Sequence, residues 1–208
     1  MKKYSWLVFG VLLMFCFGCS HFKGYIEIVK DESISKEYLN ELNKWTRDKT
    51  VYSQFETKAR IVATYKNREF NKAYLSEYSR IYSLTESEKK SRKEILTDVS
   101  SDFTEFLFYA YTPDRDSNDF DRQNSIWTIF LLDEKGEKVY PAEIRRIKKI
   151  TPLIGEFYPY VNQYYGMLYS LKFSPLSHAS EQGDDIKPQQ LKLVFTSVLG
   201  RVEFEWKM

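Results

Sequence analysis

Three residues with side-chain oxygen atoms occur at every second position of one short segment. Asp114, Asp116 and Asn118 have the spacing with which a calcium loop presents its first ligands. Beyond them the EF-hand pattern ends, because Asp119 stands where the loop needs Gly and Ser125 where it needs a bidentate Glu. The segment therefore matches a calcium site only in part, and the alternative is a solvated loop rich in turn-forming residues.

A second group of residues has the types that nucleophilic catalysis uses. Ser177 and His178 lie near Asp184 and Asp185 in the sequence, and a catalytic nucleophile needs a base beside it. No Gly-x-Ser-x-Gly elbow holds the serine in place, so we interpret the stretch as a surface loop. The other histidine is His21. Neither histidine has a metal-ligand spacing, so the sequence predicts no metal and no cofactor.

Carboxylates that act as a catalytic pair come together only in the folded chain, so their spacing in sequence carries no information. An envelope hydrolase with a dispersed acidic site is therefore an open alternative, although we expect no enzymatic activity.

Tyrosine is concentrated in one tract of the chain. The sequence contains 16 Tyr, and four of them lie close together at Tyr158, Tyr160, Tyr164 and Tyr165. A tyrosine offers a flat apolar face and a hydroxyl group, which suits contact with a sugar or a peptide. These four residues are the candidate binding surface. The alternative is that they pack in the core beneath a loop.

The N-terminus combines a positive start with a short apolar run. Lys2 and Lys3 precede an uncharged segment of about a dozen residues, from Trp6 to Phe17, whereas a helix that spans a bilayer needs about 20. This length is typical of a secretory signal peptide. The run ends in Phe15-Cys16-Phe17-Gly18-Cys19, which resembles the lipobox of bacterial lipoproteins. The resemblance covers about the first 20 residues, and ordinary secretory cleavage is the alternative.

The resemblance implies cleavage before Cys19 and attachment of lipid to this cysteine. Residues 1–18 would then be the signal peptide, and residues 19–34 the lipidated cysteine and a tether. The chain contains two Cys, Cys16 and Cys19, so the mature protein would keep one, and lipidation accounts for it. Two or more acyl chains hold a protein on a membrane almost permanently. By analogy with the family, Ser20 after the cysteine indicates the outer membrane.

The charge of the chain is balanced, which excludes some partners. The sequence has 31 Lys and Arg against 29 Asp and Glu, and removal of Lys2 and Lys3 with the signal peptide leaves 29 against 29. A nucleic-acid partner is not expected, because such binding needs a basic excess to release phosphate counterions. The expected partners are the membrane, reached through the lipid, and an envelope protein or glycan.

The elements that would position these residues fall into two groups. Apolar residues at three- and four-residue spacing predict helices over residues 36–47 and 68–83, and a capping box at Thr85 and Glu88 starts another, over 85–99. Over residues 55–65 helix and strand signals compete, and the alternation of Ile61, Ala63 and Tyr65 favours a strand. Strand patterns then follow over residues 103–111, 125–133, 138–147, 164–173, 190–198 and 201–206.

This order predicts a single α+β domain over residues 35–208, helical in 35–100 and strand-rich in 101–208. We expect N-terminal helices followed by an antiparallel β-sandwich or open barrel of about six strands. The predicted function is that of a membrane-anchored envelope lipoprotein that acts as a non-catalytic binding or assembly module. The hydrolase and a calcium-dependent adhesion module that uses Asp114, Asp116 and Asn118 are the alternatives.

Overall fold

The computed structural model describes residues 34–132, 136–174 and 190–207, except for the side chains of residues 95–102. Cys19 and the tether lie outside the described residues, as do both histidines and the candidate nucleophile Ser177 with Asp184 and Asp185. Ile34, the last residue of the expected tether, is buried in the hydrophobic core, so the described domain begins at this residue.

The described residues contain four α-helices, one short 3-10 helix and nine strands. The helices are α3 (Lys36–Trp45), α4 (Arg68–Ile81), α5 (Glu86–Asp102) and α6 (Pro152–Phe157), with η2 (Arg115–Ser117) between β3 and β4. The strands are β1 (Thr46–Ser53), β2 (Glu56–Tyr65), β3 (Thr104–Tyr111), β4 (Thr128–Leu132), β5 (Lys138–Val139), β6 (Glu143–Ile147), β7 (Met167–Phe173), β8 (Gln190–Ser197) and β9 (Gly200–Lys207).

Each α-helix starts at a side chain that satisfies its free N–H groups. Ser35, Asn67 and Thr151 cap α3, α4 and α6, and in each case the side-chain oxygen accepts a hydrogen bond from a backbone N–H of the first turn. The capping box predicted for α5 is confirmed: Thr85 accepts from the Glu88 N–H, and the Glu88 carboxylate accepts from the Thr85 N–H.

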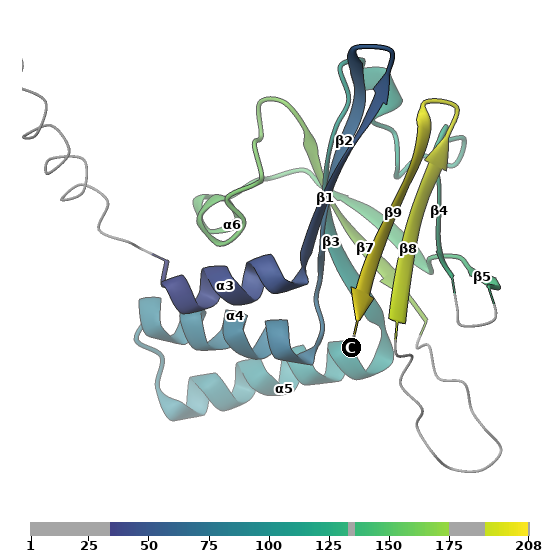
Figure 1. Cartoon of the computed structure of the whole chain (residues 1–208). Coiled ribbons are helices and arrows are strands. Elements are labelled where there is room, and N and C mark those ends of the chain that lie inside the picture. Colours follow the sequence, from purple (N-terminus) through teal and green to yellow (C-terminus); the bar gives the residue numbers. More distant parts are fainter. Residues whose placement is uncertain (1–33, 133–135, 175–189, 208) are drawn as a thin grey trace, which may run out of the picture. The chain divides into compact units, whose positions relative to one another are not determined.

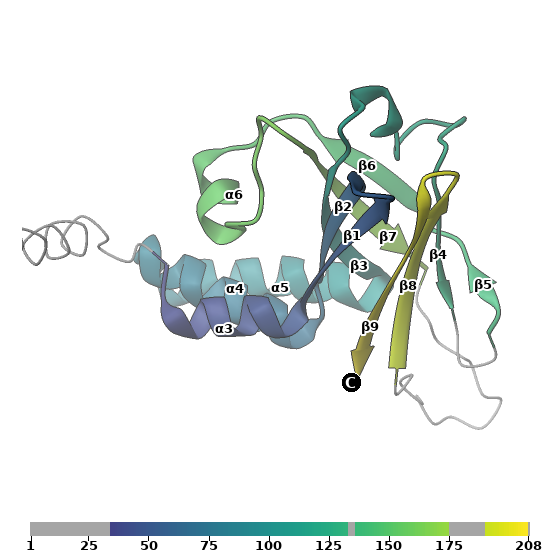
Figure 2. The same cartoon turned by 45° about the horizontal axis from the view of Figure 1, so that its top comes forward.

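The strands form two antiparallel sheets. The five-stranded sheet has the order β1-β2-β3-β7-β6, and the four-stranded sheet has the order β5-β4-β8-β9. Helices α3, α4 and α6 lie on the side of the five-stranded sheet that faces away from the four-stranded sheet (Figure 1; Figure 2). The five-stranded sheet therefore has one face toward the helices and one toward the other sheet.

Aromatic side chains fill the space on both faces of the five-stranded sheet. Between the sheets, the rings of Phe106 and Trp206 have centroids 5.3 Å apart, and those of Phe108 and Phe195 are 5.1 Å apart. Toward the helices, the Tyr38 ring lies 5.2 Å from that of Phe157. The high aromatic content of the sequence therefore largely serves the core, because large rings bury much apolar area.

The two edge strands of the five-stranded sheet have different surroundings. On one side β1 and β9 adjoin, and the Arg47 Nε–H donates to the Glu205 carbonyl oxygen over 2.9 Å. On the other side of the five-stranded sheet, β6 is the edge strand. It carries Arg145 and Arg146 and is followed by the exposed Lys148 and Lys149.

The α+β class with antiparallel sheets is confirmed, but the order of elements differs from the prediction. The β1–β2 hairpin lies between α3 and α4, so the helices do not all precede the strands. Strand β1 was missed because its sequence is mostly polar and only Val51 is buried in it. The predicted strand 138–147 is two strands in different sheets, since Pro141 between them lacks the N–H that a continuous ladder requires.

Candidate functional site

One end of the two sheets collects several connections that are far apart in the sequence. The turn between β1 and β2 and the turn between β8 and β9 lie there, together with η2 and the loop between α6 and β7 (Figure 1; Figure 2). Strand pairing agrees, because Ala110 at the end of β3 is opposite Met167 at the start of β7. We call this region the hairpin end.

The β1–β2 turn presents aromatic rings to solvent. Ser53 pairs with Glu56, so Gln54 and Phe55 form the turn, and Gln54 has a left-handed φ of 56°. The Phe55 side chain is fully exposed, with a relative accessibility of 102%, and Tyr52 beside the turn is 65% exposed. The Phe55 ring at the apex of this hairpin therefore contributes nothing to the core.

The β8–β9 turn presents an aliphatic side chain beside the first hairpin. Ser197 pairs with Gly200, which leaves Val198 and Leu199 in the turn. Val198 is 89% exposed, whereas Leu199 packs against the core. Gly200 has a φ of 142°, and a Cβ at this position would lie 2.5 Å from the Cγ1 atom of Val51 in β1. The absence of a side chain at Gly200 thus lets the two hairpins lie side by side.

The loop before β7 presents two further tyrosines. The Asn162 carboxamide oxygen accepts from the Tyr164 N–H over 3.0 Å, and the Asn162 carbonyl accepts from the Tyr109 hydroxyl over 3.1 Å. A Cβ at Gly166 would lie 2.4 Å from the Tyr109 ring, so glycine is required for the loop to rest on β3. Tyr164 and Tyr165 are 72% and 67% exposed as a result of this turn.

The structure does not place the four predicted tyrosines on one surface. Tyr158 is buried, and burial raises the pKa of its hydroxyl well above the ordinary value. The Tyr160 hydroxyl lies 2.8 Å from the Thr64 Oγ1 in β2, and burial raises its pKa too. Tyr158 is therefore a core residue, and the partly buried Tyr160 packs against the core, so neither belongs to an exposed binding surface. Only Tyr164 and Tyr165 of the predicted group are exposed.

The predicted calcium residues also have structural roles. The Asp114 carboxylate caps η2: it accepts from the Asp116 N–H over 3.1 Å and the Ser117 hydroxyl over 2.7 Å, and these bonds lower its pKa. Asn118 is buried, and its carboxamide donates to the Ala110 carbonyl and accepts from the Tyr169 hydroxyl.

The three side chains of this loop therefore do not converge on a shared point, because Asn118 is used inside the fold. Within the part of the chain that the structure describes, no group of three His, Cys, Asp or Glu side chains could hold a metal ion.

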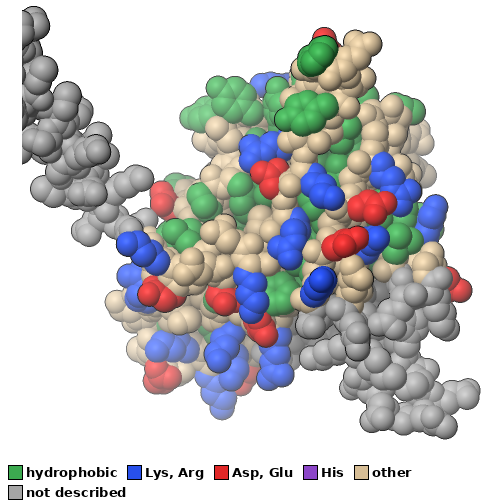
Figure 3. Space-filling view, in the orientation of Figure 1, with side chains coloured by type: hydrophobic (Ala, Val, Ile, Leu, Met, Phe, Trp, Pro, Cys, Tyr) green, Lys and Arg blue, Asp and Glu red, His purple; other side chains and the backbone are tan. Residues whose placement is uncertain are grey.

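The hairpin end contains most of the large apolar side chains exposed to solvent. Of ten such side chains in the described residues, six lie at this end: Tyr52, Phe55, Ile126, Tyr164, Tyr165 and Val198. Tyr52 is near the end of β1, and Ile126 precedes β4, whose Thr128 pairs with Thr196 near the β8–β9 turn. Hydrophobic atoms gather at the upper part of the molecule, over these connections (Figure 3). An exposed apolar patch assembled from separate segments marks a site of interaction. This patch is the candidate functional site.

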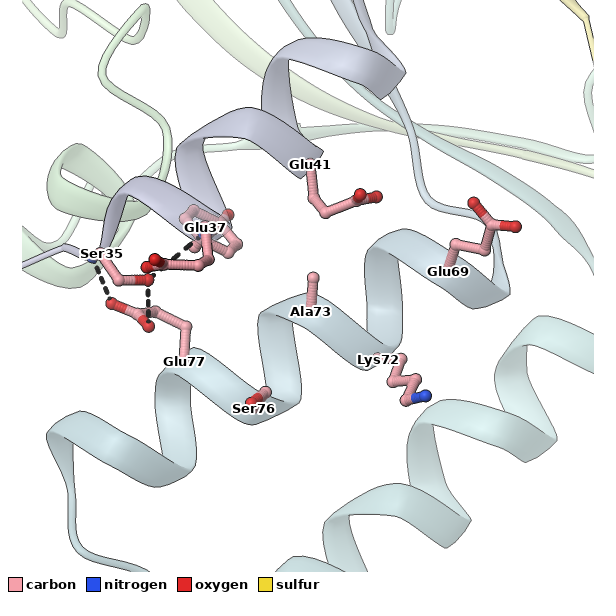
Figure 4. Close-up of a pocket in the computed structure, with 9 residues that line it drawn as sticks. Ser35, Glu37, Glu41, Glu69, Lys72, Ala73, Ser76 and Glu77 are labelled. Carbon is pink, nitrogen blue, oxygen red and sulfur yellow. Dashed lines mark hydrogen bonds between the residues drawn. The ribbon is translucent and has the colours of Figure 1, made fainter.

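A groove between α3 and α4 is the other candidate, and it is acidic. Its volume is about 410 Å³, and Glu37, Glu41, Glu69 and Glu77 are among its lining residues. The Glu77 carboxylate accepts from the Ser35 N–H over 2.7 Å and from the Ser35 hydroxyl over 2.8 Å (Figure 4). It also pairs with Arg80 at 2.7 Å.

These bonds give Glu77 a structural function. The Arg80 guanidinium, together with the Ser35 donors, holds the pKa of Glu77 at about 2 in spite of its burial. A general acid needs the opposite shift, toward neutral pH. Glu77 thus fixes the start of α3 on α4, and Glu69 pairs with Lys44 at 2.7 Å across the same two helices. Glu77 and Glu69 are therefore both used in contacts that hold α3 against α4.

Of the four predicted tyrosines, two are exposed, Tyr164 and Tyr165, and sequence reasoning missed Tyr52, Phe55 and Val198. The signal for Val198 was present, because Leu199-Gly200 between two strand patterns indicates a hairpin turn. For Phe55 the sequence signal of a hairpin was weaker, because the first strand of that hairpin, β1, is mostly polar and has no clear apolar alternation.

No family model matches the chain, and neither a curated protein nor a solved structure does. Across the described ranges, no helix has the length and apolar content needed to cross a membrane.

Proposed function

We propose that this chain is a bacterial lipoprotein of the outer membrane, anchored by lipid on Cys19. Its mature domain acts as a non-catalytic binding or assembly module whose contact surface is the hairpin end. Support for the anchor comes from the signal-like N-terminus and the lipobox-like sequence before Cys19. For the architecture of this module we propose an open sandwich with helices on one outer face. The aromatic side chains that face one another between the two sheets support this proposal.

The observation that carries the binding function is the exposure of apolar side chains at the hairpin end. Three separate connections bring Phe55, Val198 and Tyr165 to this end, and each side chain is more than 60% exposed. Gly166 and Gly200 hold two of these connections in place by close contact with neighbouring strands. The framework that presents the patch is thus well packed, while the patch itself is open to a partner.

The anchor is tested by metabolic labelling with radioactive palmitate and by cell fractionation. We expect the native chain to take up the label and to sediment with membranes, and the Cys19→Ser chain to do neither. A native chain without label that fractionates as soluble material would contradict the anchor.

The contact surface is tested by photo-crosslinking in intact cells. A photoreactive amino acid replaces Tyr165 in one variant and Tyr82, which is 49% exposed at the end of α4, in the control. We expect crosslinked products at position 165 and few at position 82. Equal crosslinking at both positions would show that the hairpin end is not a preferred contact surface.

A further inference from the structure

We propose that the partner of the hairpin end is the surface of a lipid bilayer, with Phe55 and Val198 inserted among the lipid headgroups. This inference rests on the proposed lipid anchor, which keeps the domain beside a membrane. It identifies the chemical class of the partner that the hairpin end contacts under the proposed function.

The first argument is the shape of the patch. Phe55 and Val198 stand at the apices of two hairpins, with relative accessibilities of 102% and 89%. A rigid partner would need a matching hollow for each projecting apex, whereas the interfacial layer of a bilayer deforms around both. Both apices are apolar, which the hydrocarbon boundary favours, and Val198 has no group with which to bind a sugar.

The second argument is the type of residue around the apices. Tyr52, Tyr164 and Tyr165 are each at least 65% exposed, and tyrosine has an apolar ring with a polar tip. Such residues concentrate at the boundary between water and the bilayer, where both parts of the side chain are satisfied. The hairpin end thus has apolar tips with tyrosines around them, as a surface that enters the headgroup layer requires.

Cationic groups lie where lipid phosphates would meet this surface. Ile147 pairs with Leu168 near the start of β7, so the exposed Lys148 and Lys149 that follow β6 lie toward the hairpin end. Arg115 is held there as well, because its guanidinium donates to the Tyr164 carbonyl oxygen over 3.3 Å. A basic residue close to an anionic leaflet contributes to binding.

Acidic groups at the same end offset the charge of these cations. Glu56 beside the β1–β2 apex is paired with Lys58 at 2.6 Å, and Asp114 is used to cap η2. Asp116, in η2, and the exposed Asp121 remain as negative charges at this end. Apolar insertion is therefore the main contribution, with the basic residues as support.

The length of the chain between anchor and domain permits this contact. Fourteen residues separate Cys19 from Ile34, and a chain of this length spans at most about 50 Å. A domain of this size has a radius of gyration of about 16 Å. The lipid and the hairpin end can therefore enter the same bilayer. Because the anchor makes the second contact intramolecular, even a modest affinity suffices.

The test uses the lipidated full-length protein in vesicles made of equal amounts of phosphatidylethanolamine and phosphatidylglycerol. Phe55→Cys and Val198→Cys are each labelled with the polarity-sensitive fluorophore NBD, and Tyr82→Cys is the control. All three positions are exposed, so the label does not disturb the core. The measurements are the emission maximum and the quenching by lipids that carry a nitroxide in the headgroup or the acyl chain.

We expect a blue-shifted emission and severalfold stronger quenching at positions 55 and 198 than at position 82. In a Val198→Cys chain, the added change Phe55→Asp lowers the docked fraction by about tenfold or more, because a Phe side chain is then no longer buried. The added change Tyr82→Asp leaves it unchanged. Labels at positions 55 and 198 that report water, as position 82 does, would overturn the proposal.

Two further outcomes separate this inference from the proposed function. If the labels report water on vesicles but become shielded in intact cells, a protein or glycan covers the hairpin end, and the bilayer is not its partner. The mass of the N-terminal peptide reports the anchor independently. A chain without lipid overturns the anchor, while a blue shift on added vesicles still supports docking by the hairpin end.

Discussion

The aromatic side chains under the helices and those at the hairpin end have opposite environments. Under the helices, the Tyr38 hydroxyl donates to the Phe157 carbonyl over 3.0 Å, and both residues are buried. At the hairpin end, Phe55 and Tyr165 face solvent. The same residue types stabilise the fold in one region and are free for a partner in the other. An aromatic side chain is buried where helices and strands surround it and exposed where it lies in a turn or loop at the end of the sheets.

The largest expected difference between the regions is in stability. Phe157→Ala removes a ring that packs against Tyr38, Tyr74 and Tyr78, so we expect a loss of about 3–5 kcal/mol in the free energy of unfolding. The matched change Phe55→Ala removes a fully exposed ring and costs at most about 0.5 kcal/mol. Chemical denaturation of both variants measures the contrast. Similar losses for the two would remove the distinction between the regions.

The helical region also depends on one carboxylate, and this gives it a pH dependence. Glu77 has a pKa of about 2 in the folded chain, below the value of about 4.3 of an unperturbed glutamate. Its contribution is fully present above this unfolded value and is lost as the pH falls from about 4 toward 2.

We expect Glu77→Gln to lose about 2–3 kcal/mol at neutral pH, with a smaller difference from the native chain at pH 3. Denaturation curves at both pH values measure this difference in the free energy of unfolding. The control is Glu69→Gln, which changes an exposed glutamate. A difference that does not depend on pH would contradict the assigned role of Glu77.

The position of the β8–β9 hairpin against β1 depends on Gly200. Gly200→Ala adds a methyl group against Val51 at a backbone conformation that favours glycine, and such overpacking costs about 1–3 kcal/mol. We expect Val51→Ala to recover part of this loss in the double variant. The two single variants and the double variant form a cycle that measures the coupling. Losses that simply add would show that the hairpins do not touch at this point.

The smallest expected effect compares two tyrosines of one tract. Tyr160→Phe removes the hydroxyl next to Thr64 and costs about 1 kcal/mol. Tyr165→Phe changes an exposed side chain and leaves the free energy of unfolding the same within about 0.5 kcal/mol. Thermal unfolding of the two variants checks the difference. A larger loss at Tyr165 would place it in the core.

Local signals in the sequence predicted the elements that depend on them. The capping box of α5 was visible because it involves residues only three positions apart. The alternation in β9 was visible because the strand has one buried and one wet face. The hairpin strand β1 was missed, since an edge strand with one buried residue has no clear apolar period.

The candidate site was only half predictable because burial depends on distant partners. Tyr160 is held by Thr64, 96 positions earlier in the sequence, whereas Tyr164 and Tyr165 lie on a turn set by Asn162. Nothing within the tract distinguishes these tyrosines by composition. The calcium pattern was misleading for the same reason, because the partner that holds Asn118 inside the fold is Tyr169, 51 positions away.

The edge strand β6 has a consequence for the behaviour of many copies on one membrane, where the proposed lipid anchor would hold them. A lipid anchor confines proteins to two dimensions, where an open strand edge invites pairing with a neighbour's edge. Arg145 and Arg146 lie along this edge, with Lys148 and Lys149 just beyond it. Two such edges would bring like charges together, and their repulsion opposes the joining of sheets. Glu143 in the same strand lies 3.6 Å from Arg145 and offsets part of this charge, so the net effect of the basic residues is to disfavour edge-to-edge pairing of two copies.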